Sequence, residues 1–201
     1  MAAPITFYLE FSSPYAYLAA QSIDEVAERH GRDVLWRPIS IAHIWRDIGV
    51  TAESVPRVKM LHSRVDAMRC AELDGVPFTV PANFPVDAKL ARLAFYRLDA
   101  TNPDLARRFA FAVFHQYWGE GKNIREVGHL SGLASGLRIS DEDLSAALDD
   151  TNAKQRMIAA TNEARDSGCF GVPWFAVDGE TFWGHDRIPY IDKWLARQQA
   201  D

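Results

Sequence analysis

A pair of serines at residues 12–13 stands where a strand-like segment meets a helix-like one. Residues 7–11 are mostly apolar, Pro14 follows the serines, and an Ala-rich apolar pattern begins directly afterwards. Proline at the first helical position is typical of a helix N-terminus, where free N–H groups and the helix dipole favour an anion. Ser13 is therefore a candidate donor to a bound thiolate. A helix cap explains the same residue, and Ser12 competes for that capping role.

This junction is not suited to disulfide exchange, because residues 12–16 contain no cysteine. Cys70 and Cys169 are the only cysteines, and they lie far apart without the spacing of a redox or zinc motif. We expect two buried or half-buried thiols. The histidines also lack partners at metal-like spacing, so we predict no metal site.

A second candidate feature is the Phe-Gly-Val-Pro sequence at residues 170–173. A bond before proline adopts the cis form far more readily than other peptide bonds, so we predict a cis bond between Val172 and Pro173. Such a bond would expose the N–H and C=O of Val172, which could then pair with an extended peptide. An ordinary turn is the alternative explanation of this sequence.

A third candidate is the Trp-Gly-His-Asp-Arg sequence at residues 183–187, which ends a strand-like run and opens the last helix-like run. Asp186 is suited either to capping that helix or to binding the amino group of a small zwitterion. His185 is a possible general base, but a partly exposed loop histidine is the simpler interpretation.

The elements that must position these residues follow a definite order. Strand-like patterns occupy residues 5–11, 34–39, 172–177 and 180–183, and the Asp-Gly pair at 178–179 predicts a hairpin between the last two. The apolar spacing predicts helices over residues 14–30, 41–48, 56–74, 87–99, 103–118, 124–133, 140–148, 151–165 and 187–198.

This order predicts an α/β protein with a thioredoxin-like layer. The βαβ and ββα halves that such a layer needs come from residues 1–41 and 166–201. Residues 42–165 carry almost only helical patterns, so we predict a large all-helical domain inserted between the two halves.

Composition excludes several functional classes. The chain has 201 residues, 48% of them hydrophobic, and a formal net charge of −5 with scattered basic residues. We therefore expect a protein that binds no nucleic acid. No apolar run approaches the length of a membrane span, and the first residues show no basic region of a signal peptide, so we expect a cytoplasmic protein without membrane association.

Taken together, these motifs resemble the 2-hydroxychromene-2-carboxylate isomerases, a DsbA-like family related to the kappa-class glutathione transferases. The resemblance covers nearly the whole chain in order, through residues 7–19, 76–84, 118–121, 170–173 and 183–187.

The resemblance implies a glutathione site. By position, Ser13 would face the glutathione sulfur, Val172 would pair with the glutathione backbone, and the turn formed by Trp183, Gly184, His185 and Asp186 would hold the γ-glutamyl end. His185 departs from the small amide that the family pattern leads us to expect.

The same resemblance places substrate or glutathione contacts at Lys59 and Phe84. A surface helix explains Lys59 equally well, and plain packing explains Phe84. The expected basic residue near position 45 and the amide or basic groups near 53–54 are missing, since the chain has Trp45, Glu53 and Ser54. We expect Arg46 to replace the missing cation.

The implied activity is a glutathione-dependent cis–trans isomerisation that interconverts 2-hydroxychromene-2-carboxylate and trans-o-hydroxybenzylidenepyruvate in aromatic catabolism. Reversible addition of a thiolate would turn the double bond into a single bond, allow rotation and regenerate the cofactor. The alternatives are a kappa-like glutathione transferase or peroxidase and a non-catalytic module that binds a thiol or peptide. Relatives lead us to expect a homodimer acting on a small aromatic carboxylate.

Overall fold

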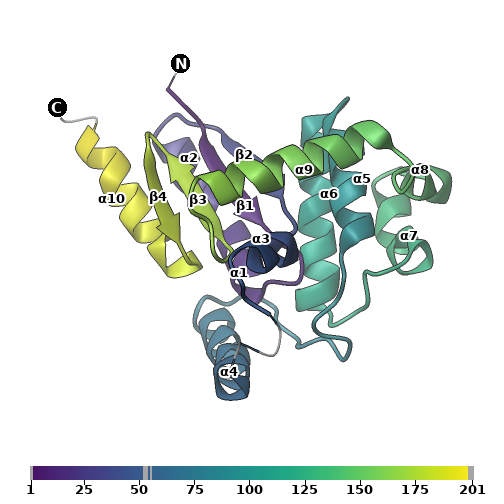
Figure 1. Cartoon of the computed structure of the whole chain (residues 1–201), viewed down its shortest axis with the longest axis horizontal. Helices are drawn as coiled ribbons and strands as arrows, with labels where there is room; N and C mark the ends of the chain where they lie inside the picture. Colours follow the sequence, from purple (N-terminus) through teal and green to yellow (C-terminus); the bar gives the residue numbers. More distant parts are fainter. Residues whose placement is uncertain (1, 52–53, 55, 199–201) are drawn as a thin grey trace.

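The protein forms a four-stranded mixed sheet surrounded by helices in the computed structural model, which describes residues 2–51, 54 and 56–198 (Figure 1). The strands are β1 (Ile5–Leu9), β2 (Val34–Pro38), β3 (Trp174–Val177) and β4 (Glu180–Trp183). The helices are α1 (Pro14–Ala20), α2 (Ile23–Arg29), α3 (Ile41–Asp47), α4 (Arg57–Leu73), α5 (Lys89–Asp99), α6 (Pro103–Phe114), α7 (Val127–Gly136), α8 (Asp141–Ala146), α9 (Thr151–Asp166) and α10 (Ile188–Gln198), with a π-helical turn at His115–Gly119 and a 3₁₀ turn at His185–Arg187.

The sheet has the order β2-β1-β3-β4 and confirms the predicted thioredoxin-like layer. β1 pairs in parallel with β2, and β3 pairs antiparallel with both β1 and β4. The hairpin between β3 and β4 turns at Asp178 and Gly179, which both have positive φ angles, 50° and 83°. Two successive residues with positive φ match the twist of the strands they join, which explains why the Asp-Gly pair is a reliable signal.

The hydrophobic core joins the sheet to the helices between its halves. Phe7 of β1 stacks on Phe175 of β3 with ring centroids 5.1 Å apart and meets the edge of Trp36 of β2 at 5.2 Å. The same buried cluster includes Phe109 and Phe114 of α6. In Figure 1, α9 runs from the helical region across the front of the sheet, while α2 lies behind it. The boundaries of the inserted domain therefore stay a prediction, because the two regions share one core.

The prediction of one helix over residues 14–30 is wrong, because the chain forms α1 and α2 instead. The amide of Ser22 bonds to the carbonyl of Ala19, three residues earlier, and the Gln21 side chain donates to the carbonyl of Tyr17 at 3.0 Å. These bonds close the first helix, and two acidic residues in the first turn of α2 suit a new N-terminus. The predicted helix over residues 103–118 also changes form, since its last turn is π-helical.

A buried ion pair ties the carboxyl end of β1 to α5. Nη1 of Arg92 donates to both carboxylate oxygens of Glu10, at 2.8 and 2.7 Å, and both residues are at most 6% exposed. Nη2 of Arg92 also reaches Asp87 at 3.1 Å. The carbonyl of Glu10 accepts the amide of Ser13, so the pair supports the loop that carries the serines.

No helix in the described part of the chain has both the length and the apolarity needed to cross a bilayer.

We predict that Arg92→Met lowers the free energy of unfolding by about 3–5 kcal/mol, because it leaves the Glu10 carboxylate buried without its partner. Urea denaturation followed by tryptophan fluorescence measures this. Arg107→Met is the matched control, since Arg107 pairs with Asp24 at a half-exposed surface and should contribute about 1 kcal/mol or less. Equal losses in the two variants would contradict the prediction.

Candidate functional site

Ser13 caps α1 and reaches the segment before β3. Its hydroxyl oxygen accepts the amide of Ala16 at 3.2 Å, and its hydroxyl donates to the carbonyl of Val172, also at 3.2 Å. The capping interpretation is therefore confirmed, and a second contact accompanies it. A serine hydroxyl has one proton to donate, so a bound anion would compete with Val172 for that proton.

The bond between Val172 and Pro173 is cis, as the sequence predicts. The next contact along this segment is between the carbonyl of Pro173 and the amide of Gly184, at 3.0 Å. Gly184 has φ of 109°, in a region that favours glycine, so the turn after β4 depends on it. The predicted residues Val172 and Gly184 are thus brought close together by adjacent strands.

The aromatic side chain of Trp183 extends the same site. Its indole meets the ring of Phe170 edge to face at a centroid separation of 4.7 Å. A Cβ atom on Gly171 would stand 2.7 Å from the Trp183 indole nitrogen, so only glycine fits between them. Phe170 and Trp183 are both close to half exposed, which leaves an aromatic surface beside Val172.

Tyr15 links α1 to α4 and to the turn after β4. Its ring stacks on the His185 ring, with centroids 5.2 Å apart and planes 11° from parallel. Its hydroxyl donates to a carboxylate oxygen of Asp66 at 2.9 Å and lies 3.4 Å from the carbonyl of Ser63. Burial and the Asp66 carboxylate together raise the pKa of Tyr15 well above its ordinary value.

His185 is half-buried in the turn after β4, whereas Asp186 is exposed. Burial lowers the pKa of His185, and the Asp186 carboxylate offsets part of that shift, so a neutral imidazole is favoured. Asp186 is exposed within the 3₁₀ turn and faces Arg187 at 3.4 Å. Its carboxylate is accessible to a cationic group of a ligand.

Two of the predicted substrate contacts lie on or against α4. Lys59 is exposed in its first turn, four residues before Ser63 and seven before Asp66, and therefore on the face that meets Tyr15. Phe84 is half-buried and packs against Trp118 with ring centroids 5.3 Å apart. The Trp118 indole donates to the carbonyl of Phe11 at 2.9 Å, directly before the serine pair.

Arg46 lies on α3 and lines a cavity of about 550 Å³ between α3, α5 and α9. Lys89 and Lys154 line it as well, whereas Ser13 and the residues of the turn after β4 do not. The neighbouring Trp45 faces the other way, since its indole donates to the carbonyl of Phe170 at 2.9 Å. Ser54 is exposed, and Glu53 lies outside the described residues.

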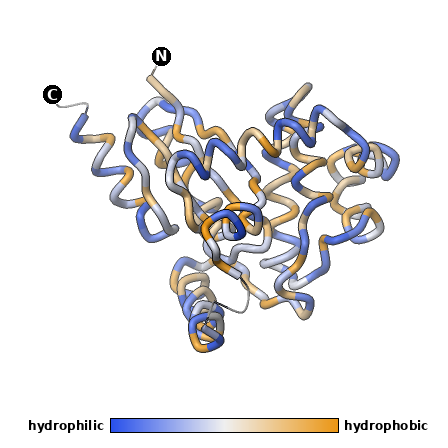
Figure 2. The backbone as a smooth tube through the Cα atoms, in the orientation of Figure 1, coloured by the Kyte–Doolittle hydropathy of each residue, from blue (hydrophilic) through white to orange (hydrophobic). Residues whose placement is uncertain are grey.

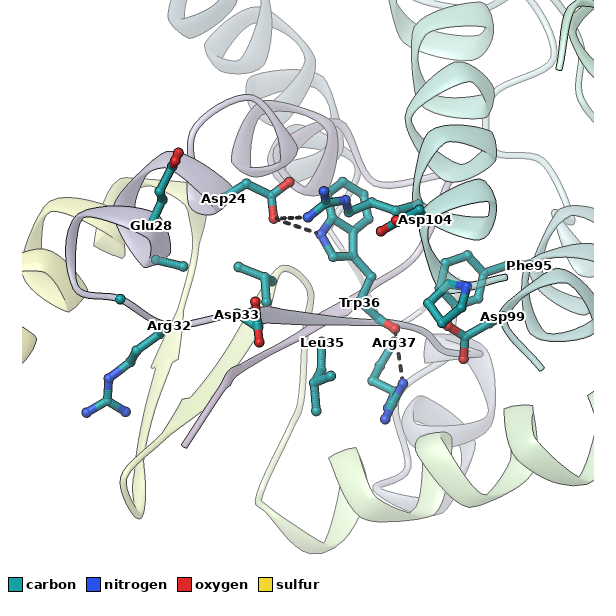
Figure 3. Close-up of a pocket in the computed structure, with 15 residues that line it drawn as sticks. Asp24, Glu28, Arg32, Asp33, Leu35, Trp36, Arg37, Phe95, Asp99 and Asp104 are labelled. Carbon is teal, nitrogen blue, oxygen red and sulfur yellow. Dashed lines mark hydrogen bonds and ion pairs between the residues drawn. The ribbon is translucent and has the colours of Figure 1, made fainter. Parts of the chain in front are cut away.

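Figure 3 shows another cavity, of about 670 Å³, along the edge of β2. Asp24 at its rim accepts the indole N–H of Trp36 at 3.2 Å and a contact from Arg107 at 3.4 Å. Its lining includes none of the predicted site residues.

The two cysteines lie as predicted, half-buried at Cys70 and buried at Cys169. Burial raises the pKa of the Cys169 thiol to about 11, and Gly171 accepts its S–H at 3.4 Å. Such a thiol stays protonated near neutral pH and is a poor nucleophile.

Sequence reasoning missed the roles of Tyr15, Asp66 and Arg64. Arg64 places its guanidinium over the Phe84 ring, with Cζ 5.1 Å from the centroid. Helical spacing from Lys59 could have placed Asp66 on the same face, but the partner in α1 depends on how α4 docks.

Comparisons with known proteins agree with this fold. The DSBA-like thioredoxin domain family matches residues 4–196. The chain is 31% identical to a 2-hydroxychromene-2-carboxylate isomerase of Sphingobium xenophagum, over 97% of this chain and 99% of that one. It is 24% identical to glutathione S-transferase kappa 2 of Caenorhabditis elegans, over 96% and 91% of the two chains. A solved structure of a 2-hydroxychromene-2-carboxylate isomerase superposes with a TM-score of 0.82 at 28% identity, covering 98% of each chain.

The matching domain spans almost the whole chain, and the isomerase relatives match it from end to end in sequence and in structure. The chain thus belongs to the 2-hydroxychromene-2-carboxylate isomerase family of DsbA-like thioredoxin folds and is an enzyme of the isomerase type.

Proposed function

We propose that this protein is a glutathione-dependent cis–trans isomerase that interconverts 2-hydroxychromene-2-carboxylate and trans-o-hydroxybenzylidenepyruvate. The observation that carries the proposal is the position of Ser13, whose hydroxyl lies between the start of α1 and the carbonyl of Val172. DsbA-like folds that exchange disulfides need a cysteine at the start of this helix. A serine there retains a hydrogen-bond donor and removes the redox chemistry.

The residues present fit glutathione by the chemistry of their polar groups. The Ser13 hydroxyl suits a thiolate, the peptide groups of Val172 suit an extended peptide, and the exposed Asp186 carboxylate suits an ammonium group. These groups come from three chain segments that contact one another through the bonds from Ser13 to Val172 and from Gly184 to Pro173.

When bound, glutathione would supply a thiolate that adds reversibly to the carbon β to the substrate ketone and so removes the barrier to rotation. The Ser13 hydroxyl would turn its proton from Val172 towards the sulfur, because a charged acceptor makes the stronger bond. His185, favoured as neutral and stacked on Tyr15, would add no positive charge beside Asp186 to that of Arg187. Lys59, Phe84 and Arg46 remain the proposed substrate contacts.

A kappa-like glutathione transferase is the second candidate, favoured by the match to the Caenorhabditis elegans protein. Such an enzyme would use the same thiolate but release a conjugate. Measuring free thiol during turnover separates the two functions, because an isomerase leaves the glutathione concentration unchanged.

We predict that Ser13→Ala lowers kcat for isomerisation by about 100-fold, as the loss of one donor to a developing or bound anion commonly does. A spectrophotometric assay of 2-hydroxychromene-2-carboxylate with and without glutathione measures this. Ser13→Thr should keep most activity, because it retains both the hydroxyl and the cap.

Two further variants separate catalysis from folding. Ser13→Gly costs a helix cap only a few tenths of a kcal/mol, so its activity should fall as far as that of Ser13→Ala while it stays folded. Ser12→Ala removes the adjacent hydroxyl and should be active. Full activity of Ser13→Ala would show that Ser13 acts only as a helix cap. A wild type that is inactive with glutathione would disprove the proposed reaction.

We predict that Asp186→Asn weakens glutathione binding about tenfold, because an amide replaces the charged acceptor for the γ-glutamyl ammonium. Isothermal titration calorimetry gives the Kd directly. Asp104→Asn, an equivalent change at an exposed residue in the first turn of α6, should bind as the wild type does. Unchanged affinity in Asp186→Asn would place the ammonium group elsewhere.

The homodimer also stays a prediction, and α4 offers a face for it. Val58, Leu61, Val65 and Met68 repeat at helical spacing and are 48–75% exposed. Figure 2 shows hydrophobic residues alternating with hydrophilic ones along this helix, which stands apart from the main body. A stripe of this kind is typical of a helix that packs against another protein surface.

We predict that light scattering gives twice the chain mass of 22.6 kDa and that Val65→Glu shifts the protein towards the monomer, since a buried charge opposes association. Ile158→Glu makes the same change on an exposed part of α9 and should leave the mass unaltered. A wild-type monomer would disprove the dimer, and a dimeric Val65→Glu would move the interface away from α4.

A further inference from the structure

Arg64 is a cation without an anionic partner in the part of the chain that the structure describes. It lies in α4 with its guanidinium over the ring of Phe84, at 5.1 Å. Arg69, five residues later in the same helix, is paired with Asp66 at 3.3 Å. Arg64 has no ion pair and no side-chain hydrogen bond with any of the described residues.

The side chain of Arg64 is also partly desolvated. The residue is half-buried, and its Nε atom is fully buried without a hydrogen-bond partner among the described residues. Withdrawing a charged donor from water is unfavourable unless an acceptor replaces the lost hydration. The contact with Phe84 supplies only the weak attraction between a cation and an aromatic ring. An incoming carboxylate would supply acceptors to the two terminal nitrogens, which are not among the buried unpartnered atoms. A guanidinium binds a carboxylate through two parallel bonds.

The surroundings of Arg64 are aromatic and lead to the predicted catalytic serine. Phe84 packs against Trp118, and Phe78 stacks on Trp118 with ring centroids 5.3 Å apart. The Trp118 indole is bonded to the carbonyl of Phe11, two residues before Ser13. The aromatic cluster Phe78–Phe84–Trp118 therefore contacts both the guanidinium and the segment that leads to Ser13. A flat aromatic acid would match both features, with its ring beside the cluster and its carboxylate on the guanidinium.

We propose that Arg64 binds the carboxylate of the aromatic acid substrate; the identity of that acid rests on the proposed function. Arg64 thus takes a role for which the sequence offered Arg46 and Lys59. Arg46 lines the cavity between α3, α5 and α9, where Lys89 and Lys154 accompany it. Lys59 lies on the face of α4 that meets Tyr15, about 140° around the helix axis from Arg64 by ideal helical geometry.

Calorimetric titration with trans-cinnamate and with its neutral amide tests the proposal without any turnover. The wild type should bind the carboxylate at least about tenfold more tightly than the amide, and Arg64→Met should abolish that difference. Arg64→Lys keeps the charge but not the planar fork, so part of the difference should return. Arg108→Met removes an exposed positive charge from α6 and should bind both probes as the wild type does.

The result that would overturn the proposal is equal binding of cinnamate by the wild type and Arg64→Met, or no preference of the wild type for the carboxylate. Circular dichroism and an unchanged Kd for glutathione show that Arg64→Met is folded. In the isomerase assay, Arg64→Met should raise KM for the acid about tenfold while KM for glutathione stays the same. A wild type that shows Arg64-dependent cinnamate binding but no isomerisation would disprove the proposed reaction and leave the carboxylate site supported.

Discussion

The buried ion pair between Glu10 and Arg92 is the constraint on which the arrangement of the site depends. A charged carboxylate at the carboxyl end of the central strand must be neutralised, and among the described residues the Arg92 guanidinium from α5 is its ion-pair partner. The pair thereby fixes the helical region against the sheet at the point where β1 leads into the loop of Ser13. Because the carbonyl of Glu10 also accepts the amide of Ser13, the position of the catalytic candidate follows from the same residue.

Three chain segments then meet at this end of the sheet, and contacts between them add to the bonds within each segment. The hydroxyl of Ser13 bonds to Val172, the amide of Gly184 bonds to Pro173, and the ring of Tyr15 stacks on His185. The result is a DsbA-like fold with a serine at the helix start, where folds that exchange disulfides need a cysteine. Under the proposed function, the reactive thiol belongs to a separate molecule.

Features governed by local sequence could be predicted, and features governed by packing could not. The strands, the Asp178-Gly179 hairpin and the cis bond at Pro173 all follow from residue types at fixed spacing. The break between α1 and α2 was missed because apolar periodicity continues through Gln21 and Ser22 while the hydrogen bonds change. The contact of Arg64 with Phe84 depends on how α4 docks, which no pattern within that helix records.

The π-helical turn after α6 has a consequence for how this family can vary in length. One additional residue in that turn directs the carbonyl of Trp118 to the amide of Thr79, and the glycine at position 121 makes room for the Thr79 side chain. Deleting a single residue there would restore ordinary helical geometry and rotate Trp118 by about 100°, away from both Phe84 and the carbonyl of Phe11. Insertions and deletions at this π-helical turn should therefore be rare among relatives that keep the aromatic cluster. Surface loops, in contrast, usually tolerate them.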